Sequence, residues 1–257
     1  MTVPLYDAFS QDYDRFVDWE ARLRFELPFF REVFRQHEVQ TVLDAACGTG
    51  QHAIAFAREG LTVAAADLSG AMVARARANA EAAGVSLRVR QAGFGGLAEA
   101  FDAVRYDAVT CLGNSLPHLT TPEALDVGLA DMAAVLNPGG VLIIQNRNMD
   151  RVLDRGERFM PPQAHRGEEA EWLFFRFYDF DGPQLDFNVL RLHRPLSGPW
   201  QIEYEQTPLR AWRRAELDQA LQEVGLSVLG AYGSYRGERF DPQESGDLIL
   251  VAVKPDA

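Results

Sequence analysis

The stretch Val42–Gly50, VLDAACGTG, decides the fold. It begins as a short apolar strand, extends back to Thr41 and runs directly into a tight turn. Gly48 and Gly50 allow the backbone to turn sharply and let a ligand approach it closely. A helix, Gln51–Glu59, is expected after the turn and ends at Gly60. This order predicts the first unit of an open α/β sheet, in which ligands bind at the carboxyl ends of the strands.

The same alternation continues along the chain. Further apolar runs predict strands, and with Thr41–Ala46 they are Leu61–Ala66, Val85–Gln91, Tyr106–Cys111 and Val141–Gln145. The segments between them have helix caps and helix-forming residues, and the expected helices are Gln51–Glu59, Gly70–Ala83, Gly96–Ala103 and Pro122–Leu136. Five strands alternating with four helices imply a mainly parallel sheet with helices on both faces.

The flanking regions have different patterns. Aromatic residues at helical spacing fill residues 1–38, where Pro28 is expected to divide two helices. After residue 150, alternating aromatic-rich runs separated by turn residues predict antiparallel strands at Trp172–Phe180, Leu185–His193 and Trp200–Thr207. A helix, Arg214–Val224, and two strands, Leu226–Tyr232 and Asp247–Val253, close the chain.

No linker long enough to separate independent domains is evident, so we expect one domain over residues 1–257. Its parts are an N-terminal helical cap at 1–38, a cofactor-binding core at 40–145, an antiparallel insertion or lid at 150–207, and a final helix and strands at 208–257.

Composition excludes several classes of protein. The 257 residues include 25 Lys+Arg against 37 Asp+Glu, a net charge of −12, which argues against sequence-independent nucleic-acid binding. We expect no membrane span and no signal peptide. Cys47 and Cys111 suit a reduced, cytoplasmic protein, and no metal site is expected.

Two carboxylates flank the glycine turn. Asp44 precedes it, and Asp67 ends the next strand, where a carboxylate accepts hydrogen bonds from both hydroxyls of a ribose. A dinucleotide-dependent dehydrogenase is the first alternative. The acid beside the turn disfavours a pyrophosphate, and the third glycine position of that fingerprint is Ala53. S-adenosylmethionine, a cation without phosphate, suits the pair better.

VLDAACGTG and the later ADLSGAM (Ala66–Met72) resemble the first two motifs of class I S-adenosylmethionine-dependent methyltransferases. That resemblance implies a Rossmann-like, seven-stranded sheet whose last strand is antiparallel. CLGNSLPHL (Cys111–Leu119) and GGVLIIQNRNMDRVL (Gly139–Leu153) are more narrowly similar to the glycine and sarcosine N-methyltransferases. Residues 155–207 match no motif of that family.

The resemblance assigns residues to the cofactor. Ala46, Gly48 and the surrounding loop, including Asp44 and Gly50, face its methionine part, and Asp67 holds the ribose. Those near the adenine are Leu68, Met72, Gly93 and Phe94, although Phe94 is equally expected as a core aromatic. Leu112 contacts the cofactor. His118 either bonds to it or caps the next helix, and Arg35 either reaches its carboxylate or lies on the surface.

The resemblance also assigns an acceptor site. Asn114 and Arg147 follow neighbouring strands, and in the family the matching Asn and Arg hold an amino-acid substrate. The planar guanidinium of Arg147 suits a carboxylate, and the alternative for this residue is a salt bridge, for example to Asp150. Gln145-Asn146 replace the family's Asp-His, a difference that bears on specificity.

Tyrosines are candidates to line the acceptor pocket, namely Tyr6, Tyr13, Tyr178 and Tyr204. Tyr6-Asp7 and Tyr13-Asp14 repeat a pair that commonly precedes the first strand in small-molecule methyltransferases, and Tyr13 is also assigned to the cofactor side.

The leading hypothesis is an enzyme that transfers a methyl group from S-adenosylmethionine to a small molecule, first of all to an amino-acid amine such as glycine or sarcosine. In-line positioning suffices for this chemistry, and no general base is assigned. Two alternatives stay open: another small metabolite methylated on N, O or C, and a non-catalytic sensor of the cofactor. No membrane or nucleic-acid partner is expected, and a homo-oligomer is possible.

Overall fold

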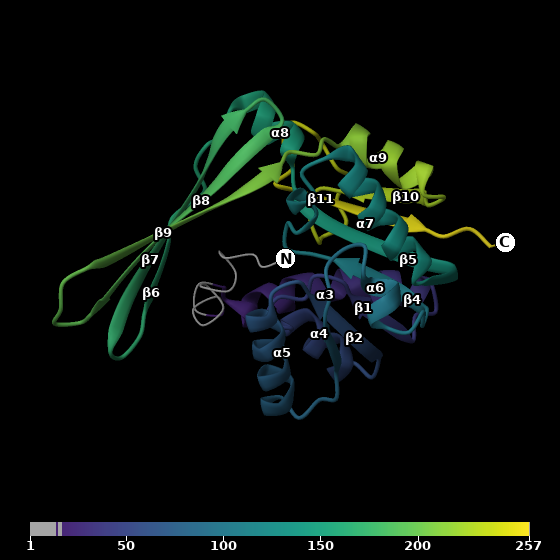
Figure 1. The fold of residues 1–257 in the computed structure, drawn as a ribbon, viewed down its shortest axis with the longest axis horizontal. Coiled ribbons are helices and arrows are strands. Elements are labelled where there is room, and N and C mark those ends of the chain that lie inside the picture. Colours follow the sequence, from purple (N-terminus) through teal and green to yellow (C-terminus); the bar gives the residue numbers. More distant parts are fainter. Residues whose placement is uncertain (1–13, 15–16, 257) are drawn as a thin grey trace.

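The structure, a computed structural model, describes residue 14 and residues 17–256. They form a seven-stranded sheet covered by helices and a second, four-stranded sheet that extends away from this body (Figure 1). The predicted fold class is confirmed.

The seven-stranded sheet has the order β10-β11-β5-β4-β1-β2-β3. Its strands are β1 Thr41–Asp44, β2 Thr62–Asp67, β3 Arg88–Gln91, β4 Tyr106–Cys111, β5 Leu136–Arg147, β10 Ser227–Tyr232 and β11 Asp247–Val253. Strands β1 to β5 are parallel, and β11 is antiparallel to both its neighbours. Strand order reverses between β1 and β4, the place where open α/β sheets bind ligands.

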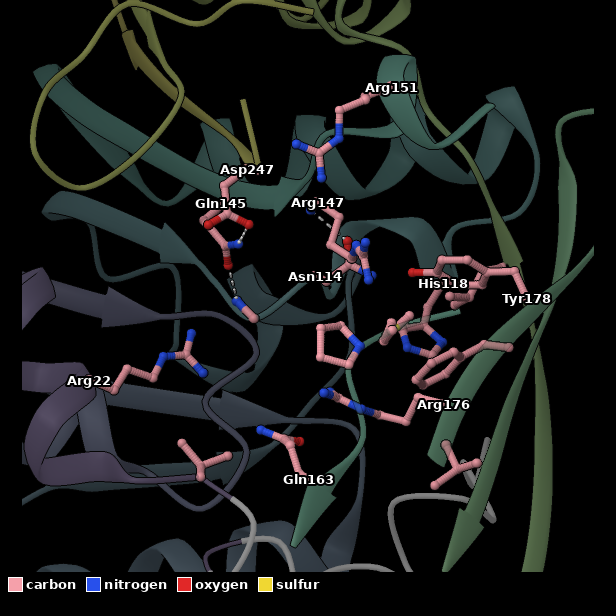
Figure 2. A pocket seen from close by; sticks show the side chains of 18 of the residues that line it. Arg22, Asn114, His118, Gln145, Arg147, Arg151, Gln163, Arg176, Tyr178 and Asp247 are labelled. Atoms are coloured by element: carbon pink, nitrogen blue, oxygen red, sulfur yellow. Dashed lines mark hydrogen bonds between the residues drawn. The ribbon is translucent and has the colours of Figure 1, made fainter. Parts of the chain in front are cut away.

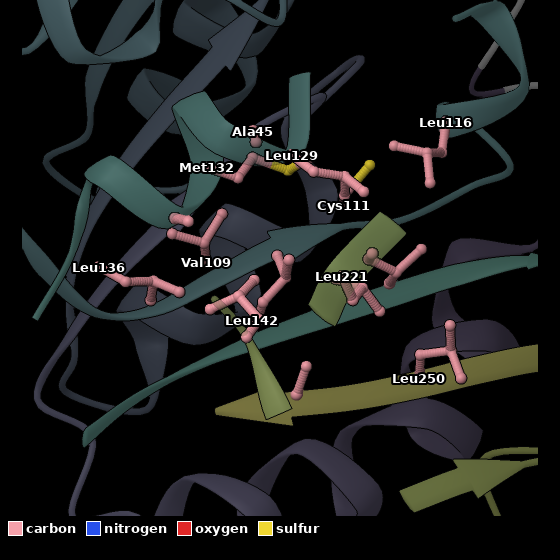
Figure 3. Packing of buried hydrophobic residues seen from close by; sticks show 14 of the residues in the cluster. Ala45, Val109, Cys111, Leu116, Leu129, Met132, Leu136, Leu142, Leu221 and Leu250 are labelled. Carbon is pink, nitrogen blue, oxygen red and sulfur yellow. The ribbon is translucent and has the colours of Figure 1, made fainter. Parts of the chain in front are cut away.

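Helices cover both faces of this sheet. Successive residues of a strand point to opposite faces, so an apolar strand has side chains to bury on both sides. Val42 of β1 joins a cluster with Phe30 and Phe56, on the side of α3 (Trp19–Gln36), α4 (Gln51–Arg58) and α5 (Gly70–Ala82). Leu43 joins the opposite cluster, on the side of α6 (Leu97–Ala100), α7 (Pro122–Ala134) and α9 (Arg214–Glu223). Figure 3 shows that second cluster, with Leu129 and Leu221 packed over the strands.

The four-stranded sheet has the order β6-β7-β8-β9 and is antiparallel throughout. Its strands are β6 Gln163–Arg166, β7 Ala170–Asp181, β8 Gln184–Pro195 and β9 Gln201–Arg210. A small apolar cluster ties its base to α8 (Met149–Arg155), and its buried members are Met149, Val152, Tyr178, Leu185, Leu209 and Ala211. The base of the four-stranded sheet is therefore packed against the helical body of the molecule.

Two local expectations were wrong. Pro28 does not divide a helix, since α3 continues through it. Pro28 is exposed, so water can satisfy the carbonyl left unpaired by its missing N–H, while Phe29 and Phe30 beside it are buried and hold the helix. Strand β5 begins at Leu136 rather than Val141, because the Asn-Pro-Gly-Gly segment pairs irregularly with β4 instead of ending a helix.

Candidate active site

The turn after β1 has the conformation that its glycines permit. Gly48 and Gly50 have φ values of +53° and +81°, and Gly50 begins α4. A Cβ atom on Gly50 would lie 3.0 Å from the Cβ atom of Ala76 on α5. Glycine is therefore required at position 50 for both conformation and space.

Asp67, at the end of β2, joins this turn to the start of α5. Its Oδ2 accepts a hydrogen bond from the backbone N–H of Gly48 at 2.8 Å. Its Oδ1 accepts one from the N–H of Ser69 at 2.9 Å. Ser69 is the N-cap of α5, as predicted, and accepts from the N–H of Met72 at 3.1 Å. The carboxylate is held at the edge of the sheet and remains partly exposed.

Asp44 is a buried acid beneath the same turn. Its Oδ1 accepts a hydrogen bond from Thr110 Oγ1 at 3.2 Å, and its Oδ2 has no hydrogen-bond partner among the described residues. Burial raises the pKa of Asp44 to about 6, and the nearby Asp67 carboxylate contributes in the same direction. A buried carboxylate oxygen without a donor is costly by itself, so this position favours a cationic ligand.

Apolar residues line the far side of the turn. Met72 and Leu112 are buried, and Gly93 lies so close to Leu68 that a Cβ atom there would be 2.9 Å from Leu68 Cδ1. Phe94 is partly buried and packs against the core near α7.

Asp14 is the one described residue of the first sixteen, and it contacts the turn. Thr49 Oγ1 donates a hydrogen bond to Asp14 Oδ1 at 2.6 Å, and Asn79 Nδ2 donates to Asp14 Oδ2 at 3.1 Å. Asp14, the acid of the second Tyr-Asp pair, therefore contacts both the turn and α5. Tyr6, Asp7 and Tyr13 lie outside the described residues.

A cavity of about 600 Å³ lies between the carboxyl edge of the seven-stranded sheet and the four-stranded sheet, and Asp44, Gly48, Gly50 and Asp67 are not among the residues that line it. Figure 2 shows it with Arg22, Asn114, Arg147, Arg176 and Tyr178 around it. Its charged lining residues are four arginines and two acids: Arg22, Arg147, Arg151, Arg176, Asp18 and Asp247. This excess of guanidinium groups suits an anionic ligand.

Asn114 and Arg147 meet at this cavity. Asn114 adopts a left-handed conformation, φ +66°, and its Oδ1 accepts a hydrogen bond from the backbone N–H of Arg147 at 3.0 Å. Gln145 fixes the same loop, because its Oε1 accepts from the N–H of Gly113 at 2.9 Å. The Arg147 guanidinium carbon lies 5.8 Å from the centre of the Tyr178 ring, and its nearest carboxylate, Glu157, is 4.0 Å away.

Asp247 stands directly opposite Arg147 where β11 pairs with β5. Its Oδ1 accepts a hydrogen bond from Gln145 Nε2 at 3.0 Å, and burial raises its pKa. Directly opposed residues of an antiparallel pair point to the same face. One cation and one anion are therefore presented side by side to the cavity.

Tyr178 and His118 complete the wall. Tyr178 is fully buried, its hydroxyl has no hydrogen-bond partner among the described residues, and it points toward Arg147 and Asn114 (Figure 2). His118 ends the short helix Leu116–His118, and burial lowers its pKa to about 4, which keeps it neutral near pH 7.

Comparisons with known proteins identify the chain. A family model for a methyltransferase domain matches residues 42–140. The glycine/sarcosine N-methyltransferase of Halorhodospira halochloris is 38% identical over 96% of this chain and 88% of its own length. That of Parasynechococcus marenigrum is 33% identical over 92% of this chain and 80% of its own length. The chain belongs to the glycine/sarcosine N-methyltransferase family.

The fold of this methyltransferase agrees with that assignment. An S-adenosylmethionine-dependent methyltransferase from Clostridium acetobutylicum superposes with a TM-score of 0.80, with 98% of this chain and 100% of the other covered, at 18% identity. The enzyme uses S-adenosylmethionine, and its residues fit that cofactor. The unpartnered Oδ2 of Asp44 suits a positive charge, and Asp67 suits a ribose diol.

Two residues assigned from the sequence do not reach the site of this methyltransferase. Arg35 lies in the last turn of α3, is exposed and pairs with Glu32 at 2.8 Å. Helix α3 ends just before β1 begins, so its last turn lies at the amino edge of the sheet, opposite the cavity. Tyr204 on β9 is 53% exposed and donates its hydroxyl hydrogen to Asn188, on the face of its sheet that the cavity does not use.

Two specific contacts considered from the sequence do not form. Asp150 does not pair with Arg147, because it receives Arg213 at 3.3 Å and the backbone N–H of Arg214 at 3.0 Å. His118 does not cap α7, whose N-cap is Thr121.

The charged lining residues that the sequence analysis did not assign to the site are Asp18, Arg22, Arg151, Arg176 and Asp247. For Arg22 a signal existed. A helix that ends immediately before β1 must run antiparallel to it, so its first turns, not its last, lie near the carboxyl edge. The Nε of Arg22 donates to Glu26 Oε1 at 2.8 Å, and Glu26 in turn contacts His52 at 2.6 Å. No such signal indicated Arg176, because the face of the sheet to which its side chain points depends on the exact register of β7.

Among residues 14 and 17–256, no three His, Cys, Asp or Glu side chains cluster as a metal site, and no helix is long and apolar enough to cross a membrane. Cys47 and Cys111 are both buried and free, and burial raises the pKa of each thiol.

Proposed function

We propose that this methyltransferase methylates the amino nitrogen of a small amino acid, with glycine and sarcosine as the first acceptors. The observation that carries the proposal is the Arg147–Asp247 pair, which lines the cavity from neighbouring strands. A zwitterionic amino acid has a carboxylate and an ammonium group a few ångströms apart. The guanidinium of Arg147 would receive the first, and the carboxylate of Asp247 the second.

The names of the relatives support the same acceptor class. Glycine/sarcosine N-methyltransferases from several organisms share 29–38% of their residues with this chain. Asn114 and Arg147 occupy the positions that the family motif gives to substrate-binding residues. The backbone bond from Arg147 to Asn114 keeps both side chains at one edge of the cavity.

For the cofactor, we propose that Asp67 holds the ribose and that Asp44 and the loop of Ala46, Gly48 and Gly50 face the methionine part. Leu68, Met72, Gly93, Phe94 and Leu112 would border the adenine and the neighbouring atoms, with His118 beside them. Arg22 replaces Arg35 as the candidate for the methionine carboxylate, because it lines the cavity and Arg35 does not. Tyr13 keeps its proposed place on the cofactor side.

Positioning accounts for the chemistry that the chain must supply. Bound S-adenosylmethionine supplies a methyl group already activated by its sulfonium. The acceptor ammonium must first release a proton to solvent, because only the neutral amine has the lone pair that forms the new N–C bond. The residues of the chain then hold this nitrogen in line, which converts a bimolecular encounter into an intramolecular one. Tyr178, with its unpartnered hydroxyl beside Arg147, would close the acceptor side and exclude water. No general base is assigned.

A second candidate is an amine that carries another anionic group. Arg176 lines the cavity from β7, and Arg151 lines it from α8. Both add positive charge beyond what one carboxylate needs.

Acceptor kinetics test the proposal. Initial rates would be measured with glycine and sarcosine, with glycinamide and methylamine, which lack the carboxylate, and with aspartate. We expect glycinamide to lose at least about 30-fold in kcat/KM, about 2 kcal/mol, because Arg147 has no partner. Equal rates for glycine and glycinamide would contradict carboxylate recognition. Tight cofactor binding without transfer to any acceptor would instead identify a sensor.

We also propose that the chain acts as one catalytic domain in the cytoplasm. The apolar cluster of α8 and the four-stranded sheet supports the single domain, because it joins that sheet to the body. The two buried free thiols support a reducing compartment.

A further inference from the structure

A buried pair of polar side chains connects helix α3 to helix α4. Glu26 on α3 is 5% exposed and His52 on α4 is 6% exposed, and the Nε2 atom of His52 lies 2.6 Å from the Oε2 atom of Glu26. A glutamate is almost never fully buried unless it is paired, because removing its charge from water is costly. Neither residue lines the cavity, so the burial of this pair needs its own explanation.

Glu26 also holds Arg22. One helical turn earlier, the Nε atom of Arg22 donates a hydrogen bond to Glu26 Oε1 at 2.8 Å. Burial acts to raise the pKa of Glu26, but the hydrogen bond from His52 and the charge of Arg22 lower it overall, so the group is a carboxylate at neutral pH. An ionised carboxylate only accepts hydrogen bonds, so His52 donates from Nε2. Arg22, Glu26 and His52 are here called the α3–α4 network.

Arg22 is the member of the α3–α4 network that reaches the cavity. Its guanidinium points from α3 toward the middle of the cavity (Figure 2). The guanidinium carbon lies 5.1 Å from the centre of the Trp19 ring, and the centre of that ring lies 5.5 Å from the centre of the His52 ring, edge to face. The Arg22 side chain is therefore constrained both by a hydrogen bond and by a packed aromatic ring.

His52 ties the same network to the glycine turn. It is the second residue of α4, and the N-cap of that helix is Gly50, the last glycine of the turn. A short path of direct contacts therefore runs from the turn through His52 and Glu26 to Arg22. The turn and Arg22 come from different segments of the chain, and a cofactor that contacts both needs them at a fixed separation, which supporting hydrogen bonds provide.

We propose that Glu26 is a positioning residue for the cofactor, which holds the Arg22 guanidinium at a fixed place relative to the glycine turn. The proposal rests on the proposed function, in which Arg22 receives the methionine carboxylate. Glu26 does not line the cavity and acts through Arg22. The consequence is selective: affinity for the amino-acid end of the cofactor depends on Glu26, and affinity for the adenosine end does not.

A purely structural role for Glu26 is the alternative, and the chain offers a control for it. Arg31 on α3 and Glu59, the C-cap of α4, join the same two helices, with Arg31 Nη2 at 2.6 Å from Glu59 Oε1. Neither of these residues lines the cavity. Loss of this pair removes a contact between α3 and α4 without removing the partner of Arg22, so Glu59→Gln is the control for Glu26→Gln.

Calorimetry without any acceptor tests the proposal, with two ligands for each variant. S-adenosylhomocysteine has the amino-acid end of the cofactor, and methylthioadenosine lacks it. Glu26→Gln should weaken binding of S-adenosylhomocysteine about tenfold and of methylthioadenosine less than about twofold, because only the place of Arg22 changes. Arg22→Gln should weaken S-adenosylhomocysteine about 30-fold, since it removes the charge itself. Glu59→Gln should leave both affinities unchanged.

A double variant separates an effect through Arg22 from general loosening of the helices. Arg22→Gln with Glu26→Gln should bind S-adenosylhomocysteine no more weakly than Arg22→Gln alone, because changes that act through one contact are not additive. His52→Gln serves as a second variant if Glu26→Gln does not fold, and it should weaken S-adenosylhomocysteine about threefold and spare methylthioadenosine. Circular dichroism verifies that each variant is folded.

The other outcomes are distinguishable. Equal loss of both ligands in Glu26→Gln, or additive losses in the double variant, would overturn the positioning role and leave a structural one. Wild-type affinity for S-adenosylhomocysteine in Glu26→Gln, with a loss in Arg22→Gln, would overturn the positioning role alone. Wild-type affinity in Arg22→Gln would instead remove Arg22 from the proposed cofactor site, and the role of Glu26 with it. None of these results depends on which acceptor is methylated.

Discussion

The two sheets of this methyltransferase differ in how their faces are covered. Each strand pair in the centre of the seven-stranded sheet is buried on both faces by helices, and the site lies at one edge. The four-stranded sheet has only one face against the cavity, and large apolar residues are exposed on the other. The first sheet therefore supplies a frame covered on both faces, and the second supplies one wall of the cavity.

The largest effect is expected where the central sheet meets the cofactor. Asp67→Ala removes the acceptor of two backbone N–H groups and the proposed ribose acceptor, so cofactor affinity should fall about 100-fold, about 3 kcal/mol. Calorimetry measures this, with Asp126→Ala on the exposed side of α7 as the control. A wild-type cofactor affinity for Asp67→Ala would contradict a role of Asp67 in holding the cofactor.

The buried Asp44 of the seven-stranded sheet should make the free energy of unfolding depend on pH. Its pKa is raised from 3.8 to about 6 in the folded protein, so the folded state holds a proton that the unfolded state has released. Its contribution to the free energy of unfolding is therefore present below about pH 4 and is lost as pH rises to about 6, by roughly 2 to 3 kcal/mol.

Asp44→Asn should remove that loss. Urea unfolding of the cofactor-free protein at pH 4.5 and pH 7 would show a smaller decline for the variant than for the wild type. Its cofactor affinity at pH 7 should fall, because the negative charge is gone. Identical pH dependence in both proteins would show that Asp44 is not the responsible group.

The sequence predicted the strands of the seven-stranded sheet more completely than those of the four-stranded sheet. The strands β1, β2 and β4 are continuous apolar runs because both their faces are covered, and such runs are conspicuous. Strand β6, Gln163–Arg166, escaped notice because it is short and polar. Asp44, Asp67, Asn114 and Arg147 could be predicted as site residues, because sequence motifs place them within or just after the strands. Arg176 and Asp247 were not, because their roles depend on which strand lies opposite.

At the boundary between the sheets, Arg147→Gln should raise the KM for glycine about 30-fold, about 2 kcal/mol, while the Kd for the cofactor changes less than about twofold. Arg35→Gln is the control and should leave both unchanged, because its side chain is exposed and paired with Glu32. An equal loss of cofactor affinity in Arg147→Gln would move this residue to the cofactor side.

The smallest effects separate the two faces of the four-stranded sheet. Tyr178→Phe should raise the acceptor KM about threefold to fivefold, and it should stabilise the free protein by less than about 1 kcal/mol because an unpartnered buried hydroxyl is removed. Tyr204→Phe, on the face of this sheet that does not line the cavity, should leave KM unchanged. Steady-state kinetics of the two variants would contradict this division if Tyr204→Phe had the larger effect.

The most direct measurement is the identity of the methylated atom. The enzyme would be incubated with S-adenosylmethionine labelled with ¹³C in its methyl group and with glycine or sarcosine, and the product examined by NMR. The expected result is a labelled N-methyl signal of sarcosine or dimethylglycine that grows with time and is strongly reduced for Arg147→Gln. A labelled methyl on oxygen or carbon, or no transfer to either amine by an enzyme that binds the cofactor, would contradict it.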